Sequence, residues 1–199
     1  TTTLVQKSME LWIDPRINTV HVIHRIKNCS SSPVQISAWA LTVMAPGGRA
    51  IVPQEPYIPH PEALLPVRPL ALWSYSDLGD ARFGWGRRYV QVRQDPAARL
   101  PQKIGFLNKQ GWGGYLRAGN FFVKTVPFLA GAEYPDFLSN FEVFTNARML
   151  ELETLGPLTS LMPGASLQHE EHWFLFRGVT PGNSEEEIEE AVRRCLRVG

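Results

Sequence analysis

The sequence predicts an all-β sandwich followed by one α-helix at the C-terminal end. Short segments of alternating apolar and polar residues, each bounded by turn residues, run through most of the chain. The 16 glycines and 16 prolines among 199 residues are typical of strands joined by turns rather than of a helical bundle. A 44% share of hydrophobic residues is enough for one core. We therefore expect one sandwich domain over residues 1–182, with a helix over 183–199 packed on it.

The composition excludes several functional classes. The 20 basic and 19 acidic residues leave a net charge of +1, so the chain as a whole has no electrostatic attraction to nucleic acid or to an anionic membrane. The two cysteines, Cys29 and Cys195, exclude a disulfide-stapled scaffold and a cysteine-rich zinc site. No apolar run approaches the roughly 18 residues of a membrane-spanning helix, and Thr1 to Leu4 show no signal-peptide pattern. We expect a cytoplasmic protein, with the periplasm as the alternative.

The first part of the chain is predicted to form a β-hairpin. Residues 19–27 alternate, with Val22 and His24 on one face and His21 and Ile23 on the other. Residues 28–33 have the composition of a turn, and residues 34–43 are predicted to return antiparallel beside the first strand. Residues 53–70 contain six prolines, which lack the backbone donor that a central strand needs. We expect an ordered loop there, crossing one edge of the sheet.

The remaining strands are expected at short apolar segments separated by turns. These segments are 71–75, 89–94, 103–107, 112–117, 120–126, 140–145, 149–154 and 169–178. The last of them follows a turn at Met162-Pro163-Gly164.

One helix is predicted, after residue 183. Ser184 with Glu187 three residues later forms a capping box, and the acidic residues 185–187 lie at the positive end of the helix dipole. Basic side chains at 193, 194 and 197 lie at the opposite end. An apolar stripe at 188, 192, 195 and 196 follows helical spacing and predicts the face that packs on the sandwich.

The segment Leu150–Thr154 carries the first chemical signal. Leucine and glutamate alternate there, so Leu150 and Leu152 should point into the core while Glu151 and Glu153 share the opposite face. Neighbouring carboxylates repel, which tends to raise the pKa of one of them. A solvated strand face is the simpler interpretation of this pattern taken alone.

The surroundings of this pattern resemble the galactose mutarotase (aldose 1-epimerase) superfamily. There, a Leu-Glu-Thr strand is followed by a loop, a Pro-Gly-Glu turn and a last strand; here Leu152-Glu153-Thr154 is followed by Pro163-Gly164-Ala165, whose third position departs. The hairpin around Asn28 to Val34 also resembles that superfamily. The match is closer to a bacterial group of mutarotase-like domains, on the motifs at residues 39–42, 46–48, 76–77, 111–115, 122–124, 134–136 and 151–158.

The resemblance implies a β-supersandwich that holds a sugar, and Glu153 as the general base of an epimerase. The superfamily is longer than this chain, so we expect the first strands of the full fold to be missing from this sequence or supplied by another chain. Alignment puts Trp39 where the superfamily has its proton-donating histidine, and an indole is only a weak N–H donor. The alternative is therefore a non-catalytic sugar-binding or structural sandwich that has lost the acid.

Four side chains are candidates to replace that acid: His24, Lys103, Lys124 and Arg82. His24 shares a face with apolar residues, where a core histidine is the simpler interpretation. Lys124 lies in an apolar strand and needs either a carboxylate partner or a route to solvent for its ammonium group. We expect Glu142, on a strand predicted to lie beside it, to be that partner within the sugar site.

Tryptophan and arginine side chains complete the predicted sugar site. Trp39 and Trp85 are expected to stack on sugar rings, although each is also explained as an ordinary core or loop anchor. Arg82, in a loop whose glycines allow close backbone approach, is expected to bind hydroxyls or an acidic group.

No metal or cofactor is expected. The chain has no phosphate-binding glycine loop and no Gly-x-Ser-x-Gly elbow. His169 and His172 flank two glutamates, but solubility of an edge strand is the simpler account of that pattern. The expected partner is a small carbohydrate, with no nucleic acid or membrane, and a homodimer is among the assemblies considered.

Overall fold

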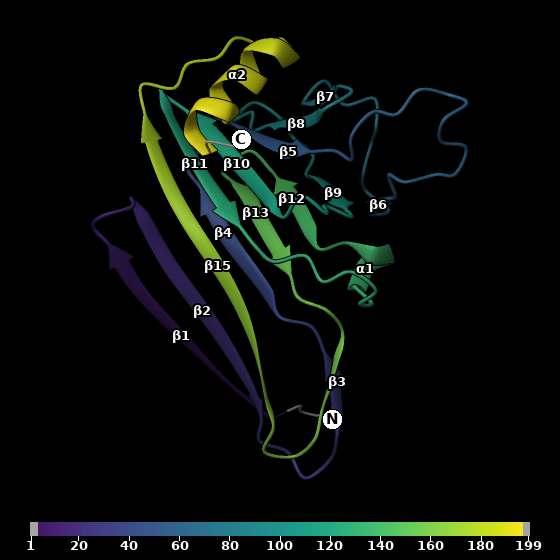
Figure 1. Ribbon diagram of the computed structural model, residues 1–199, viewed down its shortest axis with the longest axis vertical. Coiled ribbons are helices and arrows are strands. Elements are labelled where there is room, and N and C mark those ends of the chain that lie inside the picture. Colours follow the sequence, from purple (N-terminus) through teal and green to yellow (C-terminus); the bar gives the residue numbers. More distant parts are fainter. Residues whose placement is uncertain (1–3, 197–199) are drawn as a thin grey trace.

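The computed structural model describes residues 4–196 as two packed antiparallel sheets, a small third sheet and a C-terminal helix (Figure 1). The strands are β1 (Val5–Asp14), β2 (Thr19–Asn28), β3 (Val34–Ile36), β4 (Trp39–Met44), β5 (Arg49–Pro53), β6 (Leu70–Leu72), β7 (Phe83–Trp85), β8 (Tyr89–Arg93), β9 (Gln102–Phe106), β10 (Trp112–Arg117), β11 (Asn120–Thr125), β12 (Phe141–Thr145), β13 (Leu150–Leu155), β14 (Thr159–Leu161) and β15 (Ser166–Arg177). The helices are α1 (Pro135–Leu138), a single turn with positive φ angles at 136–138, and α2 (Glu185–Leu196).

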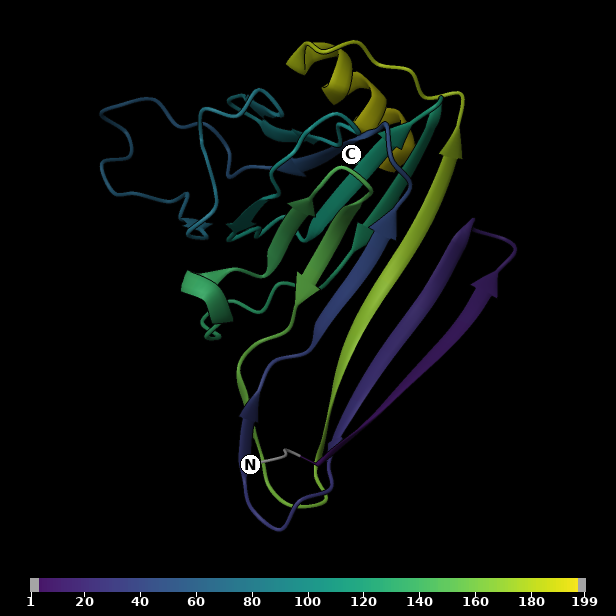
Figure 2. The same cartoon turned by 180° about the vertical axis from the view of Figure 1, so that it is seen from behind.

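Two sheets of unequal size form the sandwich. Among the described residues, the larger sheet has the order β1-β2-β15-β11-β10-β5-β8-β7, and the smaller has the order β4-β13-β12-β9-β6. A separate pair, β14 and β3, closes one end. The hairpin of β1 and β2 extends the larger sheet beyond the smaller one, as seen from both sides of the molecule (Figures 1 and 2).

The core between the sheets follows the predicted strand alternation. Leu150 and Leu152 are fully buried and pack with Phe141 and Val143 of the same sheet and with Tyr115 of the larger sheet. At about 25 cal/mol per Å² of buried apolar surface, such side chains supply most of the driving force for folding. The predicted inward face of this strand is therefore confirmed.

Helix α2 covers the outer face of the larger sheet (Figure 1). Ile188 and Val192 are buried against Phe121 and Val123, and Cys195 packs at the edge of this second core. Ser184 Oγ accepts the backbone N–H of Glu187, and the Glu187 carboxylate accepts from Ser184 in return, which confirms the predicted capping box. The last part of the predicted helix, with Arg197, lies outside the described residues.

The predicted hairpin of residues 19–43 is wrong. β2 pairs with β1 and β15, whereas the predicted return strand is split into β3, which pairs with β14, and β4, which pairs with β13 in the smaller sheet. Residues 37 and 38 interrupt the strand, so the chain crosses from one side of the sandwich to the other. Alternation identifies the faces of a strand but carries no information about its neighbour.

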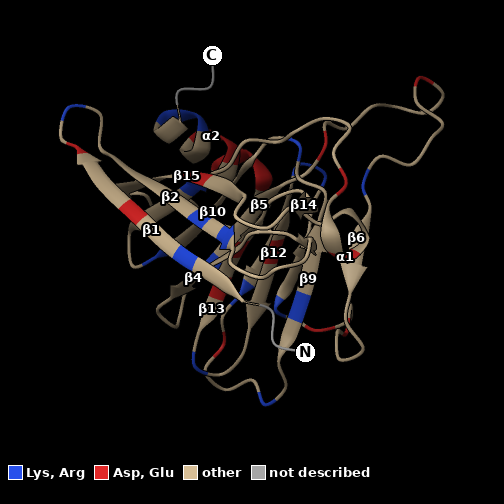
Figure 3. Cartoon of the chain, turned by 90° about the horizontal axis from the view of Figure 1, so that it is seen from below, with Lys and Arg blue, Asp and Glu red and all other residues tan. Residues whose placement is uncertain are grey.

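The proline-rich segment lacks strand structure from residue 54 to residue 69, as predicted, and projects from the sandwich as an extended loop (Figure 1). Basic and acidic residues are scattered over the strands and loops, in keeping with the balanced composition (Figure 3). Among residues 4–196, no helix is both long enough and apolar enough to span a membrane.

Candidate functional site

Two glutamates face each other on the outer surface of the smaller sheet. β13 alternates, so Glu151 and Glu153 point away from the core that Leu150 and Leu152 enter. Glu153 is paired in register with Glu142 of β12. Directly opposite residues on antiparallel strands have Cβ atoms about 4.5–5.5 Å apart, so the carboxyl groups of Glu142 and Glu153 lie close to each other.

Lys103, from β9, joins these carboxylates. Its Nζ lies 2.7 Å from Glu142 Oε2 and 2.9 Å from Glu153 Oε2. All three side chains are nearly inaccessible, with Glu153 at 0%, Glu142 at 1% and Lys103 at 7% exposure. One buried cation therefore serves two buried carboxyl groups.

Two indoles cover this triad. Trp39, at the start of β4, donates from Nε1 to Glu153 Oε2 at 2.6 Å. Lys103 Nζ lies 4.9 Å from the ring centroid of Trp39 and 4.7 Å from that of Trp73, within the range of a cation–π interaction. We call Glu142, Glu153, Lys103, Trp39 and Trp73 the carboxylate–lysine cluster. Trp39 is 54% exposed, so it forms the surface of the cluster.

The cluster raises the pKa values of two of its groups, so it keeps their protons to a higher pH than exposed side chains would. Burial, reinforced by the negative charge of Glu153, outweighs the contact with Lys103 and raises the pKa of Glu142 to about 8. Burial lowers the pKa of Lys103, but its hydrogen bonds and charge interactions with both glutamates outweigh that effect and raise the pKa above its ordinary value. At neutral pH Lys103 is therefore charged and Glu142 carries a proton.

Three buried carboxyl oxygens of the cluster have no assigned hydrogen bond among the described residues: Glu142 Oε1, Glu142 Oε2 and Glu153 Oε1. Glu142 Oε2 is in the 2.7 Å ion pair with Lys103, so Glu142 Oε1 and Glu153 Oε1 are the two left without a polar partner. A buried polar atom without a partner costs free energy, about 1–3 kcal/mol or more for a charged group. Such atoms in a folded protein call for a specific explanation, and a bound ligand or water supplies one.

A cleft lies beside the cluster. Its volume is about 680 Å³, and it runs between the β1–β2 hairpin and the edge strand β4. Its lining includes Met9, His24, Ile26, Trp39 and Leu41. This volume is in the range of small-molecule sites, and Trp39 both lines the cleft and donates to Glu153.

Lys124 and Glu142 do not form the predicted pair. Lys124 is fully buried between the two sheets, and its Nζ lies 2.6 Å from Glu171 Oε1 of β15. The pairing is wrong because β11 lies between β10 and β15 in the larger sheet, whereas Glu142 belongs to the smaller sheet. Burial lowers the pKa of Lys124, against the opposing effect of Glu171.

His24 belongs to this inter-sheet region and not to the carboxylate–lysine cluster. Its Nε2 lies 3.3 Å from Glu171 Oε2, to which Trp173 Nε1 also donates at 3.0 Å. Thr154 Oγ1 donates to Glu171 and contacts His169 Nε2 at 2.8 Å. This geometry agrees with the simpler interpretation of His24 as a hydrogen-bonded core histidine.

Arg82 and Trp85 lie apart from the cluster. The Arg82 guanidinium donates to Asp80 at 2.9 and 2.8 Å and to the Leu100 carbonyl at 2.7 Å. Trp85 lies on β7, the end strand of the larger sheet, with its ring centroid 5.5 Å from that of Phe83. The predicted gathering of these side chains with Glu153 on one surface is therefore wrong.

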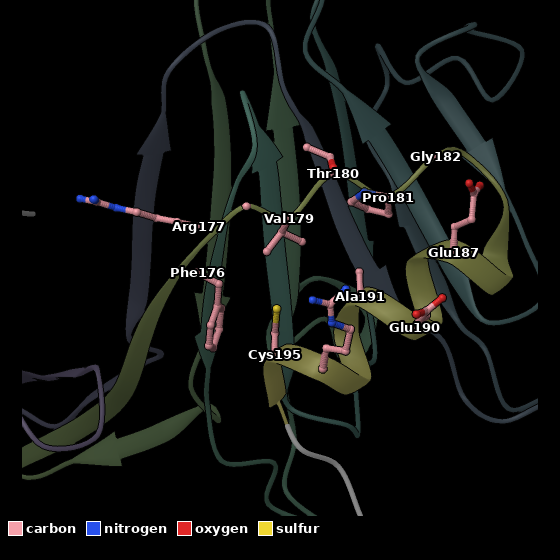
Figure 4. Close-up of a pocket in the computed structure, with 12 residues that line it drawn as sticks. Phe176, Arg177, Val179, Thr180, Pro181, Gly182, Glu187, Glu190, Ala191 and Cys195 are labelled. Atoms are coloured by element: carbon pink, nitrogen blue, oxygen red, sulfur yellow. The ribbon is translucent and has the colours of Figure 1, made fainter.

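A second cavity, of about 400 Å³, lies under the connection from β15 to α2 (Figure 4). Phe176, Val179, Glu190 and Cys195 point into or along it. None of the predicted sugar-site residues lines it.

The sequence indicates Lys103 only as a candidate to replace the acid and does not predict its position between two glutamates. The sequence did indicate that Lys103 points away from the core. Lys103 and Gly105 alternate with core residues on β9, as Glu151 and Glu153 do on β13. Glu171, the partner of Lys124, gave no such signal, because the pairing of β11 with β15 joins segments remote in the sequence.

Known structures share this fold. No family model and no curated protein matches the sequence. A candidate aldose 1-epimerase from Klebsiella pneumoniae superposes with a TM-score of 0.62 at 11% identity, over 98% of this chain and 51% of that one. A candidate aldose 1-epimerase from Escherichia coli gives 0.57 at 9% identity, over 88% and 62%. A galactose mutarotase-like protein from Lactobacillus casei gives 0.54 at 10% identity, over 87% and 64%.

The chain therefore has the galactose mutarotase-like β-sandwich fold with one C-terminal helix of substantial length, as the resemblance implied. It spans about half to two thirds of the length of these structures. Fold alone does not carry function, which has to be argued from the site.

Proposed function

We propose that this chain binds a sugar or sugar derivative at the carboxylate–lysine cluster and acts on it in the manner of an aldose 1-epimerase. The observation that carries the proposal is the unpartnered Glu153 Oε1, buried beside a second carboxyl group and beneath two indoles. The fold shared with candidate aldose 1-epimerases supports it.

The indoles provide the binding surface. Trp39 and Trp73 are disposed to stack on the C–H faces of a sugar ring, and the adjoining cleft of about 680 Å³ accommodates a ligand of that size. Because Glu153 lies beneath Trp39, the sugar reaches the carboxylate when the half-exposed indole turns aside.

Glu153 acts as the base in this proposal. Its Oε1 takes the proton of the anomeric hydroxyl, and the electrons of that O–H bond form the carbonyl at C1. The bond from C1 to the ring oxygen breaks, and the ring oxygen takes up a proton. Rotation about C1–C2 and the reverse steps give the other anomer with both protons restored.

Glu142 takes the role of the missing acid. With its pKa raised to about 8 it carries a proton at neutral pH, and it lies directly across from Glu153. The anomeric and ring oxygens are bonded to the same carbon, so an acid and a base on adjacent strands suit them. A buried carboxyl group that stays protonated at neutral pH is a common source of the acid in such sites.

The test compares mutarotation of a panel of aldoses by polarimetry for the 199-residue chain and its Glu153→Gln variant. We expect Glu153→Gln to lower the rate about 10²- to 10⁴-fold, the contribution typical of a positioned acid or base. Glu151→Gln is the matched control, because Glu151 lies two residues away on the same face and, unlike Glu153, forms no ion pair with Lys103 in the described part of the chain. Equal rates for wild type and Glu153→Gln would exclude Glu153 as the base.

A non-catalytic sugar-binding protein is the second candidate. Trp39 favours this candidate. It stands where the superfamily has its proton-donating histidine, and its indole N–H donates to Glu153 Oε2. Saturation-transfer NMR with the same sugars separates the two: binding that Trp39→Ala abolishes, with no rate above buffer for any sugar, supports this candidate. Neither binding nor turnover with any sugar would contradict both.

A further inference from the structure

A group of histidine and glutamate side chains lies on the opposite side of the molecule from Glu153. His21 of β2 and His172 of β15 are paired in register, and Glu170 lies two residues before His172 on the same face. His172 Nε2 is 3.0 Å from Glu170 Oε1. One ligand atom of each residue lies within 4.8 Å of the others.

We propose that His21, Glu170 and His172 form a binding site for one zinc-class divalent metal ion. Two imidazole nitrogens and one carboxylate oxygen are a donor set that Zn²⁺ takes up, at about 2.0–2.2 Å from each ligand atom. Imidazole favours zinc, copper and nickel, whereas calcium and magnesium require oxygen ligands.

The backbone under this site is held on both sides. β2 lies between β1 and β15, and β15 lies between β2 and β11, so both strands are interior to the larger sheet. This arrangement corrects the expectation that an edge strand explains the pattern around His172. Rigid strands present ligands with less ordering cost than loops do.

Trp12 orients one of the ligands. Its ring is stacked on His21, with centroids 4.8 Å apart and an angle of 2° between the planes. His21 also meets His172 edge to face at 4.6 Å. These contacts hold the His21 imidazole next to the imidazole of His172 on the neighbouring strand. In known metal sites, contacts to the ligand ring fix its orientation.

Two charged pairs lie on this face outside the proposed site. Arg16 contacts Asp14 at 3.2 Å, and Asp14 is close enough to His21 to interact with it electrostatically. Arg25 donates to Glu10 with contacts of 3.3 Å, so its guanidinium is neutralised by a carboxylate outside the proposed site. The remaining histidines of the sandwich, His24 and His169, lie on the inner face near Lys124 and Glu171. The proposed site therefore draws on one face of one sheet.

Equilibrium dialysis and calorimetry of the 199-residue chain, made without a histidine tag, test the proposal with Zn²⁺ as the probe. We expect one ion per chain, and we expect His21→Ala and His172→Ala each to weaken binding at least about 10-fold. His60→Ala, which alters an exposed histidine of the proline-rich loop, is the control and should bind as the wild type does.

A second measurement guards against variants that fail to fold. Glu170 is exposed, so Glu170→Gln leaves the packing intact while removing the anionic ligand, and Co²⁺ bound in place of Zn²⁺ reports the ligand set through its visible absorption. A changed cobalt spectrum in Glu170→Gln supports the site. Zinc binding unchanged in His21→Ala, or displaced equally well by Mg²⁺, would overturn it.

Discussion

At the scale of single residues, the carboxylate–lysine cluster depends on an imbalance of charge. One ammonium group, on Lys103, contacts two carboxyl groups that are both inaccessible to water. Two adjacent carboxylates in a dry region cannot both ionise without a large cost. The proton retained by Glu142 relieves that cost, and it also provides a donor that the indole at position 39 lacks.

Glu142→Gln should change how stability depends on pH. Because the pKa of Glu142 is raised from 4.5 to about 8, the native state holds a proton that the unfolded chain releases across this window. The contribution of Glu142 to stability is therefore present below pH 4.5 and is lost as the pH rises toward 8. Denaturant unfolding across the window should show a loss of a few kcal/mol in the wild type that the variant lacks.

Comparing the wild type with Glu142→Gln isolates the contribution of Glu142 to the pH dependence of stability. Burial lowers the pKa of His169 to about 4, so His169 contributes a change of opposite sign below pH 6.5 in both. Parallel stability curves for wild type and Glu142→Gln between pH 4.5 and 8 would show that Glu142 is ionised in the native state.

At the scale of elements, alternation and capping signals located most strands and the one long helix. The predicted strands at 112–117 and 120–126 correspond to β10 and β11 within one residue. Three short strands, β5, β7 and β14, had no counterpart in the prediction, because β7 and β14 have three residues each and β5 is apolar on both faces. A run of so few residues shows no period that distinguishes a strand from a loop.

The helix cap gives a prediction that belongs to this scale. Ser184→Ala removes the hydroxyl that accepts from the Glu187 backbone and should lower the free energy of unfolding by about 1 kcal/mol. Because α2 packs on the larger sheet through Ile188 and Val192, its amides should also exchange hydrogen faster. The control is Ser31→Ala, in an exposed loop. Equal stability and equal exchange in α2 for the two variants would contradict the capping role.

At the scale of the whole molecule, a buried lysine of one sheet reaches across to the other. Lys124 of the larger sheet contacts Glu171 and also donates to the Leu152 carbonyl at 3.2 Å and to Thr42 Oγ1 at 3.0 Å, both in the smaller sheet. These hydrogen bonds join the interior of the larger sheet to the smaller sheet. Such a group costs desolvation energy that its partners must offset.

Glu171→Gln should be strongly destabilising. The change leaves the Lys124 ammonium in the core without its carboxylate, for which we expect a loss of roughly 3–5 kcal/mol in the free energy of unfolding. Glu170→Gln is the matched control, because the neighbouring residue points to the exposed face of the same strand. Measured with a chelator present, the control should change stability by less than about 0.5 kcal/mol. A similarly small effect of Glu171→Gln would show that Lys124 is uncharged in the core.

The sequence by itself determined the strand faces, the helix and its cap, the strandless loop of residues 54–69 and the orientation of Glu153 away from the core that Leu150 and Leu152 enter. These features depend on residues a few positions apart, whose relation is set by backbone period and local hydrogen bonds. Tertiary structure alone decided the partners: Lys103 meets Glu153, 50 residues away, and Lys124 meets Glu171 and not Glu142. Strand order and register set those contacts, and they follow from how the whole core packs, which no local pattern encodes.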